Sequence, residues 1–132
     1  MFESFNFPQS QINKYFQAAV KDLRLASSAE APELVFYACY NIIIKLAMAV
    51  CAKNNLRVKS RAGHHVELIE KLAEYLKDEK IEDTASKMRM KRNRDLYDGG
   101  TSTSGKEAAF YLNFCRKLVA DADAYIFPNK LL

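Results

Sequence analysis

Apolar side chains recur at intervals of three and four residues along most of the chain, which is the spacing of amphipathic helices. No segment shows the strict apolar–polar alternation that is typical of a half-buried strand. The predicted helices cover, in order, residues 10–26, 32–53, 66–76, 81–98 and 104–126. Short connections between such helices predict an all-α fold, an antiparallel up-and-down bundle of about five helices. The length favours a single domain that spans residues 1–132.

The second predicted helix, Pro32 to Lys53, is apolar on nearly every side, so neighbouring helices have to cover it. It is long enough to cross a bilayer, but Asn41 and Lys45 interrupt it, which favours a buried core helix. No signal-peptide pattern begins the chain, and the three cysteines lie in apolar helical segments. We therefore expect a cytoplasmic protein with reduced, buried thiols, no cofactor and no membrane contact.

Basic residues gather in two places, after the second predicted helix and near the end of the fourth. The formal net charge of +4 is mild, so their grouping matters more than their number. Strictly alternating helices would bring both groups to one end of the bundle, where clustered cations form a surface for phosphate. The residues predicted to contact phosphate there are Arg57, Lys59, Arg61, His64, Arg89, Lys91 and Arg94.

The fourth predicted helix carries a charged residue on its core-facing side. At about 100° per residue, Ile81, Ala85 and Met88 define the apolar face, and Arg92 continues it one turn later. A charge in that position is costly unless it is paired or faces an open cleft. Two interpretations stay open, an ion pair with Asp95 that holds the helix end and a functional polar cleft.

His64 and His65 are the only histidines, and helical neighbours point about 100° apart, which makes them a poor metal-binding pair. A capping or packing role at the start of the third helix is favoured, with a phosphate contact as the alternative. The sequence contains no Walker pattern, no nucleophile elbow and no pair of catalytic carboxylates. The polar positions of the second helix are interpreted as packing groups or a dimer seam: Tyr37, Tyr40, Asn41 and Lys45.

The order of the predicted helices and one short motif resemble the HEPN superfamily (higher eukaryotes and prokaryotes nucleotide-binding domains). The resemblance covers residues 10–127 and suggests a stand-alone prokaryotic member. Weaker support comes from Gly63-His64-His65. The motif that carries the resemblance is Arg92-Asn93-Arg94-Asp95-Leu96-Tyr97-Asp98.

The resemblance implies a helical bundle that commonly forms a homodimer, and many members are metal-independent endoribonucleases of toxin–antitoxin, phage-defence or RNA-processing systems. By the family motif, Arg92 matches the arginine and Asn93 the polar residue, while Tyr97 stands where the histidine is expected. These three residues are the candidate catalytic set. A tyrosine, with a pKa near 10, is a much weaker base than histidine, which weakens the case for an enzyme.

Three functional hypotheses follow. The first is a dimeric domain that binds RNA or a nucleotide at a basic pole. The second is an active metal-independent endoribonuclease toxin in which Tyr97 replaces the histidine. The third is a non-catalytic protein-interaction module that pairs with a nucleotidyltransferase-type antitoxin.

Overall fold

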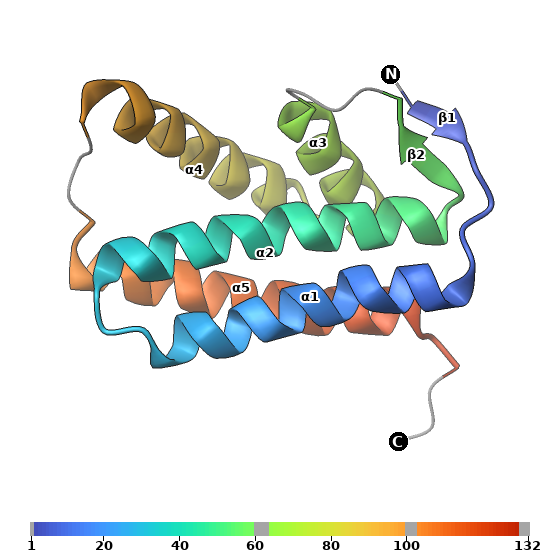
Figure 1. Cartoon of the computed structure of the whole chain (residues 1–132), viewed down its shortest axis with the longest axis horizontal. Coiled ribbons are helices and arrows are strands. Elements are labelled where there is room, and N and C mark those ends of the chain that lie inside the picture. Colours follow the sequence, from blue (N-terminus) through green and yellow to red (C-terminus); the bar gives the residue numbers. More distant parts are fainter. Residues whose placement is uncertain (1, 60–63, 100–102, 130–132) are drawn as a thin grey trace.

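Five helices form the bundle in Figure 1, a computed structural model that describes residues 2–59, 64–99 and 103–129, without the side chains of residues 97 and 98. The predicted all-α helical bundle is confirmed. A small antiparallel ribbon, which periodicity did not predict, accompanies it. The helices are α1 (Gln9–Ser28), α2 (Pro32–Lys53), α3 (His65–Leu76), α4 (Glu79–Asp98) and α5 (Gly105–Ile126), and the ribbon pairs β1 (Phe2–Ser4) with β2 (Leu56–Val58).

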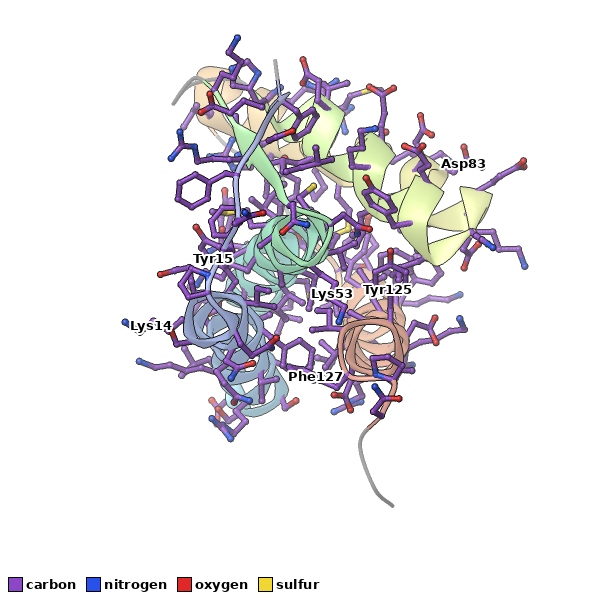
Figure 2. The ribbon with its side chains drawn as sticks, turned by 90° about the vertical axis from the view of Figure 1, so that its right-hand side faces the viewer. Lys14, Tyr15, Lys53, Asp83, Tyr125 and Phe127 are labelled. Atoms are coloured by element: carbon purple, nitrogen blue, oxygen red, sulfur yellow. The ribbon has the colours of Figure 1, made fainter. Side chains whose placement is uncertain are left out.

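Helix α2 is the centre of the core, as its apolar sequence predicts. Its Ile42, Ile43 and Leu46 are fully buried, and α1, α3 and α5 pack around it. Figure 2 looks along the bundle from the end where α2 finishes and shows α1, α2 and α5 end-on around shared side chains. By length and composition α2 could cross a membrane, but most of its apolar window is buried inside the protein, as in the core helix of a soluble domain.

The two ends of α2 follow local rules. Pro32 occupies the first turn, where its missing N–H group costs no hydrogen bond. Asn54 is the C-cap, and Asn55 adopts the left-handed conformation with φ of 59°. The Asn54 side chain donates to the Val50 carbonyl, 2.8 Å away, and lies 3.0 Å from the Tyr125 hydroxyl. Two asparagines therefore end this helix.

Helix α3 departs from strict alternation. It begins beside the middle of α2, where His65 contacts Tyr40, and it continues toward Tyr125 near the end of α5, so it runs in the same direction as α2. Helix α4 then runs back along α2 and reaches the first turns of that helix, where the Lys91 ammonium lies 5.3 Å from the Phe36 ring. In Figure 1, α4 therefore ends far from β2.

The predicted convergence of both basic groups at one pole is wrong. The segment after α2 lies at one end of the bundle and the end of α4 at the other. The prediction assumed that the third helix would run antiparallel to the second. Instead, β2 pairs with β1, and α3 starts only after the chain has returned to the middle of α2.

The ribbon joins two segments that were predicted as irregular, the aromatic N-terminal stretch and the basic loop. Phe2 lies opposite Val58, so the pairing joins residues far apart in sequence. Arg57 fastens it, since its Nε atom donates to Glu3 Oε1 at 2.8 Å and its guanidinium lies 4.1 Å from the Phe5 ring centroid. Three-residue strands are too short for an alternating pattern to be recognised.

Helix α5 begins with a capping box. The Glu107 N–H donates to the Ser104 hydroxyl at 3.0 Å, and the Ser104 N–H donates to the Glu107 carboxylate at 2.9 Å. Ser10 does not cap the first helix, although its position before the apolar stripe is typical of a cap. Helix α1 already begins at Gln9, because Pro8 takes the capping position in an extended conformation.

We expect Ser104→Ala to lower the free energy of unfolding by about 1 kcal/mol, the usual cost of losing a serine N-cap. Urea denaturation monitored by circular dichroism measures this change. Ser10→Ala is the matched control, because Ser10 lies exposed in the first turn of α1 and caps nothing. Equal losses in the two variants would contradict the assignment of the cap.

Candidate functional site

Arg92 lies where α2, the start of α3 and the second half of α4 meet. Its guanidinium is 5.4 Å from the ring centroid of Tyr40, which α2 supplies. The Tyr40 hydroxyl in turn lies 2.8 Å from Nδ1 of His65, the first residue of α3. Arg89, one turn before Arg92, is close enough to influence the protonation of both Tyr40 and His65. We call Tyr40, His65, Arg89 and Arg92 the Arg92 cluster.

The local packing of α4 explains why Arg92 is at this junction. Ile81, Ala85 and Met88 are buried, as predicted, but the buried line continues three residues later at Lys91 instead of four residues later at Arg92. A period of 3.6 residues permits either step. Lys91 takes the inward position over Phe36, and Arg92 is turned toward α3.

Of the two interpretations of Arg92, the ion pair with Asp95 is not the one that the structure shows. Asp95 is 8% exposed and faces Lys91, which is 6% exposed, with Nζ and Oδ2 3.9 Å apart. A lysine buried in this way cannot lie on a surface that contacts phosphate, so its role is structural. Arg92 remains half-buried beside Tyr40.

The protonation of Tyr40 and His65 follows from their surroundings. Burial raises the pKa of the Tyr40 phenol, although Arg92 and Arg89 oppose this effect. Burial lowers the pKa of His65, and the positive charges of Arg92 and Arg89 lower it further. Both side chains are therefore neutral at neutral pH. A neutral imidazole between a hydroxyl group and two guanidinium groups can exchange a proton with a bound molecule.

The lowered pKa of His65 predicts acid sensitivity. Below pH 6.5 the unfolded chain binds a proton at this histidine while the folded chain does not, so stability falls as the pH drops, until the folded pKa is passed. We expect the urea midpoint of unfolding to fall less between pH 7.5 and pH 5 in His65→Gln than in the unmodified protein. Tyr40→Phe is the control, since it keeps the burial and both arginines. An unchanged pH dependence in His65→Gln would contradict the assignment.

The other predicted site residues do not join the Arg92 cluster. Arg57 is engaged by Glu3 in the ribbon, and Lys59 is exposed beyond it. Arg94 is exposed on α4, and Asn93 beside it is half-buried. Arg61 lies outside the described residues.

Two further positions have only a partial description. The backbone of Tyr97 belongs to the last turn of α4, but its side chain lies outside the described part. His64 occupies the N-cap position of α3 without a side-chain capping bond. Neither of its ring nitrogens has a hydrogen-bond partner in the described part of the chain. The favoured prediction that one histidine packs at this helix start is fulfilled by His65.

Sequence reasoning missed the association of Tyr40 and His65 with Arg92. One signal was present, a tyrosine hydroxyl on an otherwise apolar helix, because a buried hydroxyl needs a hydrogen-bond partner. Models of protein families, curated proteins and solved structures were compared with the chain, and none gives a significant match. The candidate function therefore rests on the geometry of the Arg92 cluster.

Proposed function

We propose that the Arg92 cluster binds a phosphate group of RNA or of a nucleotide. The observation that carries this proposal is the pairing of two arginines with an uncharged tyrosine–histidine contact. Within the described part of the chain, neither Arg89 nor Arg92 forms an ion pair with an acidic side chain. Two adjacent guanidinium groups without a counter-charge are stabilised by a bound anion.

The chemistry of the cluster favours phosphate over a simple ion. Guanidinium groups present several N–H donors in a planar fork that matches the oxygen atoms of phosphate. The ring of Tyr40 holds the Arg92 guanidinium in place, which reduces the entropy lost on binding. Arg94 is exposed on the same helix and is available for a neighbouring phosphate of a longer ligand.

The resemblance to HEPN domains extends this proposal. By that resemblance the protein acts in the prokaryotic cytoplasm as a homodimer, within a toxin–antitoxin or defence system. A two-fold dimer would double the number of phosphate sites on one assembly. Chromatography with light scattering tests the oligomeric state. A monomer at micromolar concentration would exclude the homodimer and leave the proposed phosphate binding unaffected.

Binding is tested by fluorescence anisotropy with a labelled single-stranded RNA in the presence of EDTA. If Arg89, Arg92 and Arg94 each contact a phosphate, the logarithm of the affinity falls with the logarithm of salt concentration with a slope of about −2. An affinity for RNA that does not change with salt concentration would contradict phosphate binding. It would favour the protein-interaction module.

One observation favours a second candidate, a metal-independent endoribonuclease. His65, supplied by α3, lies in the Arg92 cluster with its ring hydrogen-bonded to Tyr40. Its lowered pKa leaves the imidazole deprotonated at neutral pH, the form that accepts a proton. This assigns the role of base to His65 in place of Tyr97.

The cleavage step is a transfer within the RNA. The 2′-hydroxyl gives its proton to His65, its oxygen forms a bond to the adjacent phosphorus, and the bond from phosphorus to the 5′-oxygen breaks. The products are a 2′,3′-cyclic phosphate and a 5′-hydroxyl, whose oxygen takes a proton from water, while His65 returns its proton to the solvent. Arg92 would stabilise the charge that develops on the phosphate oxygens.

This candidate is tested by incubating RNA with the protein and EDTA and analysing the fragments on a gel. We expect cleavage that His65→Gln abolishes and Tyr97→Phe retains. Intact RNA with the unmodified protein would eliminate the nuclease and leave phosphate binding standing. Loss of cleavage in Tyr97→Phe, with cleavage retained in His65→Gln, would assign the role of base to Tyr97.

A further inference from the structure

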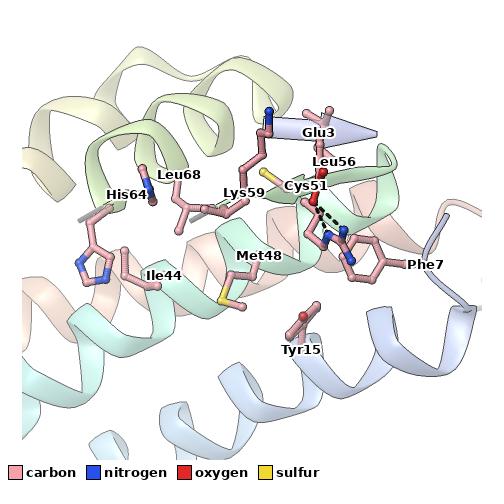
Figure 3. Close-up of a pocket in the computed structure, with 13 residues that line it drawn as sticks. Glu3, Phe7, Tyr15, Ile44, Met48, Cys51, Leu56, Lys59, His64 and Leu68 are labelled. Atoms are coloured by element: carbon pink, nitrogen blue, oxygen red, sulfur yellow. Dashed lines mark hydrogen bonds and ion pairs between the residues drawn. The ribbon is translucent and has the colours of Figure 1, made fainter. Parts of the chain in front are cut away.

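A cavity of about 640 Å³ lies beside the Arg92 cluster, between the ribbon, α2 and α3 (Figure 3). Its size is that of small-molecule binding sites in proteins. Polar and charged side chains line the cavity together with an apolar section of wall, which combines residues from three elements: Ile44, Met48, Leu56, Val58 and Leu68. A ligand inside it would bury apolar surface, which gains about 25 cal/mol per Å².

The two ends of the cavity differ in charge. At one end α3 begins, with His64 and His65 in the wall and no side chain capping the first turn. A helix start carries a partial positive charge and unsatisfied N–H groups. The other end holds the Glu3 carboxylate near Phe7, as Figure 3 shows, and Arg57 already neutralises that carboxylate at 2.6 Å.

His64 adds an independent observation at the positive end. Both of its ring nitrogens are shielded from solvent and have no hydrogen-bond partner among the described residues, and the nearest acidic group is the Glu67 carboxylate, 3.8 Å from Nδ1. Such polar atoms are usually satisfied, and leaving them without partners costs free energy. Lys59, exposed at the rim, points toward β1 in Figure 3 and adds a positive charge at the mouth of the cavity.

We infer that this cavity binds an amphipathic organic anion, an apolar body that carries a single acidic group. The acidic group lies at the start of α3, where His64 donates a hydrogen bond to it. The apolar body lies against Met48 and Leu56, pointing toward Phe7. Aliphatic and aromatic bodies both fit these walls. The inference does not depend on the proposed function, because only His65 is common to the two sites.

The probe for this site is 8-anilinonaphthalene-1-sulfonate, which has an aromatic body, one acidic group and a fluorescence that rises in apolar surroundings. The full-length protein should bind one molecule per chain. Decanoate and 1-naphthoate should both displace it, whereas decanol should be at least ten-fold weaker. Displacement by only one of the two acids identifies the preferred body. Equal competition by decanol and decanoate would overturn the requirement for an anion.

Two tryptophan substitutions locate the binding, since the chain contains no tryptophan of its own. Met48→Trp fills the cavity and should weaken probe binding at least ten-fold. Met90→Trp is the matched control, because Met90 is 53% exposed on α4 and outside the cavity. Equal affinities in both variants would overturn the location.

A surface variant covers the case in which Met48→Trp does not fold. Lys59→Glu changes an exposed side chain and should weaken the probe about five-fold or more, with an unchanged circular dichroism spectrum. Arg92→Ala separates the two sites, since it should leave probe binding within two-fold of the unmodified protein. Unchanged probe binding in Lys59→Glu would contradict the requirement for an anion.

Discussion

Lys91→Ala is expected to lower the free energy of unfolding by about 3–5 kcal/mol, the cost of removing one partner from a buried ion pair. The substitution leaves the Asp95 carboxylate, 8% exposed, without the lysine that faces it. It also removes the ammonium that lies over the Phe36 ring. Urea denaturation monitored by circular dichroism measures the loss.

The chain offers a matched control for this prediction. Lys117 and Asp121 have the same four-residue spacing on α5, and their atoms are closer, at 2.6 Å, but Lys117 is 69% exposed. Exposed pairs contribute at most about 1 kcal/mol, so Lys117→Ala should have little effect. Comparable losses in the two lysine variants would contradict burial as the deciding factor. The double variant Lys91→Met/Asp95→Leu should be more stable than Lys91→Ala, because it removes both charges of the pair.

Arg92→Ala should weaken binding of single-stranded RNA by about ten-fold to a hundred-fold. A hydrogen bond to a charged group contributes about 1.5–3 kcal/mol, and each 1.4 kcal/mol is a factor of ten in affinity. The variant should keep its fold, because Arg92 is half-buried and forms no ion pair in the described part of the chain. Anisotropy titration and thermal denaturation measure the two properties.

Two further variants sharpen this experiment. Arg92→Lys keeps the charge but loses the planar fork, so we expect an intermediate affinity. Arg24→Ala removes an exposed arginine from α1, outside the Arg92 cluster, and should leave binding within two-fold. If Arg92→Ala unfolds the protein, or binds RNA as tightly as the unmodified chain, the arginine has a structural role instead.

The helices were predictable wherever the determining interactions are local. Pro32 marks the start of α2 and Ser104 marks the start of α5, because each acts within one helical turn. The order of elements beyond α2 was not predictable in the same way. Whether α3 runs with α2 or against it depends on the ribbon, whose pairing of Phe2 with Val58 leaves no periodic signal in the sequence.

The candidate site shows the same division. The motif singled out Arg92, and the structure places it at a junction of three helices. The motif did not identify His65, because the contact with Tyr40 joins residues 25 positions apart. Lys91 was misassigned to the surface, since helical periodicity cannot choose between a step of three residues and a step of four. The roles of Asn93 and Tyr97 remain predictions from the family resemblance.

The reactivity of a buried cysteine can measure how often the helix bundle opens. Cys39, Cys51 and Cys115 are buried free thiols, as predicted, and the side-chain hydrogen bond with Cys39, together with burial, holds the pKa of Cys115 well above its usual value. A thiol in that state reacts with an aromatic disulfide reagent only after the surrounding helices separate, because the thiolate is the reactive form. The rate at which Cys115 reacts in native buffer therefore measures how often α2 and α5 come apart.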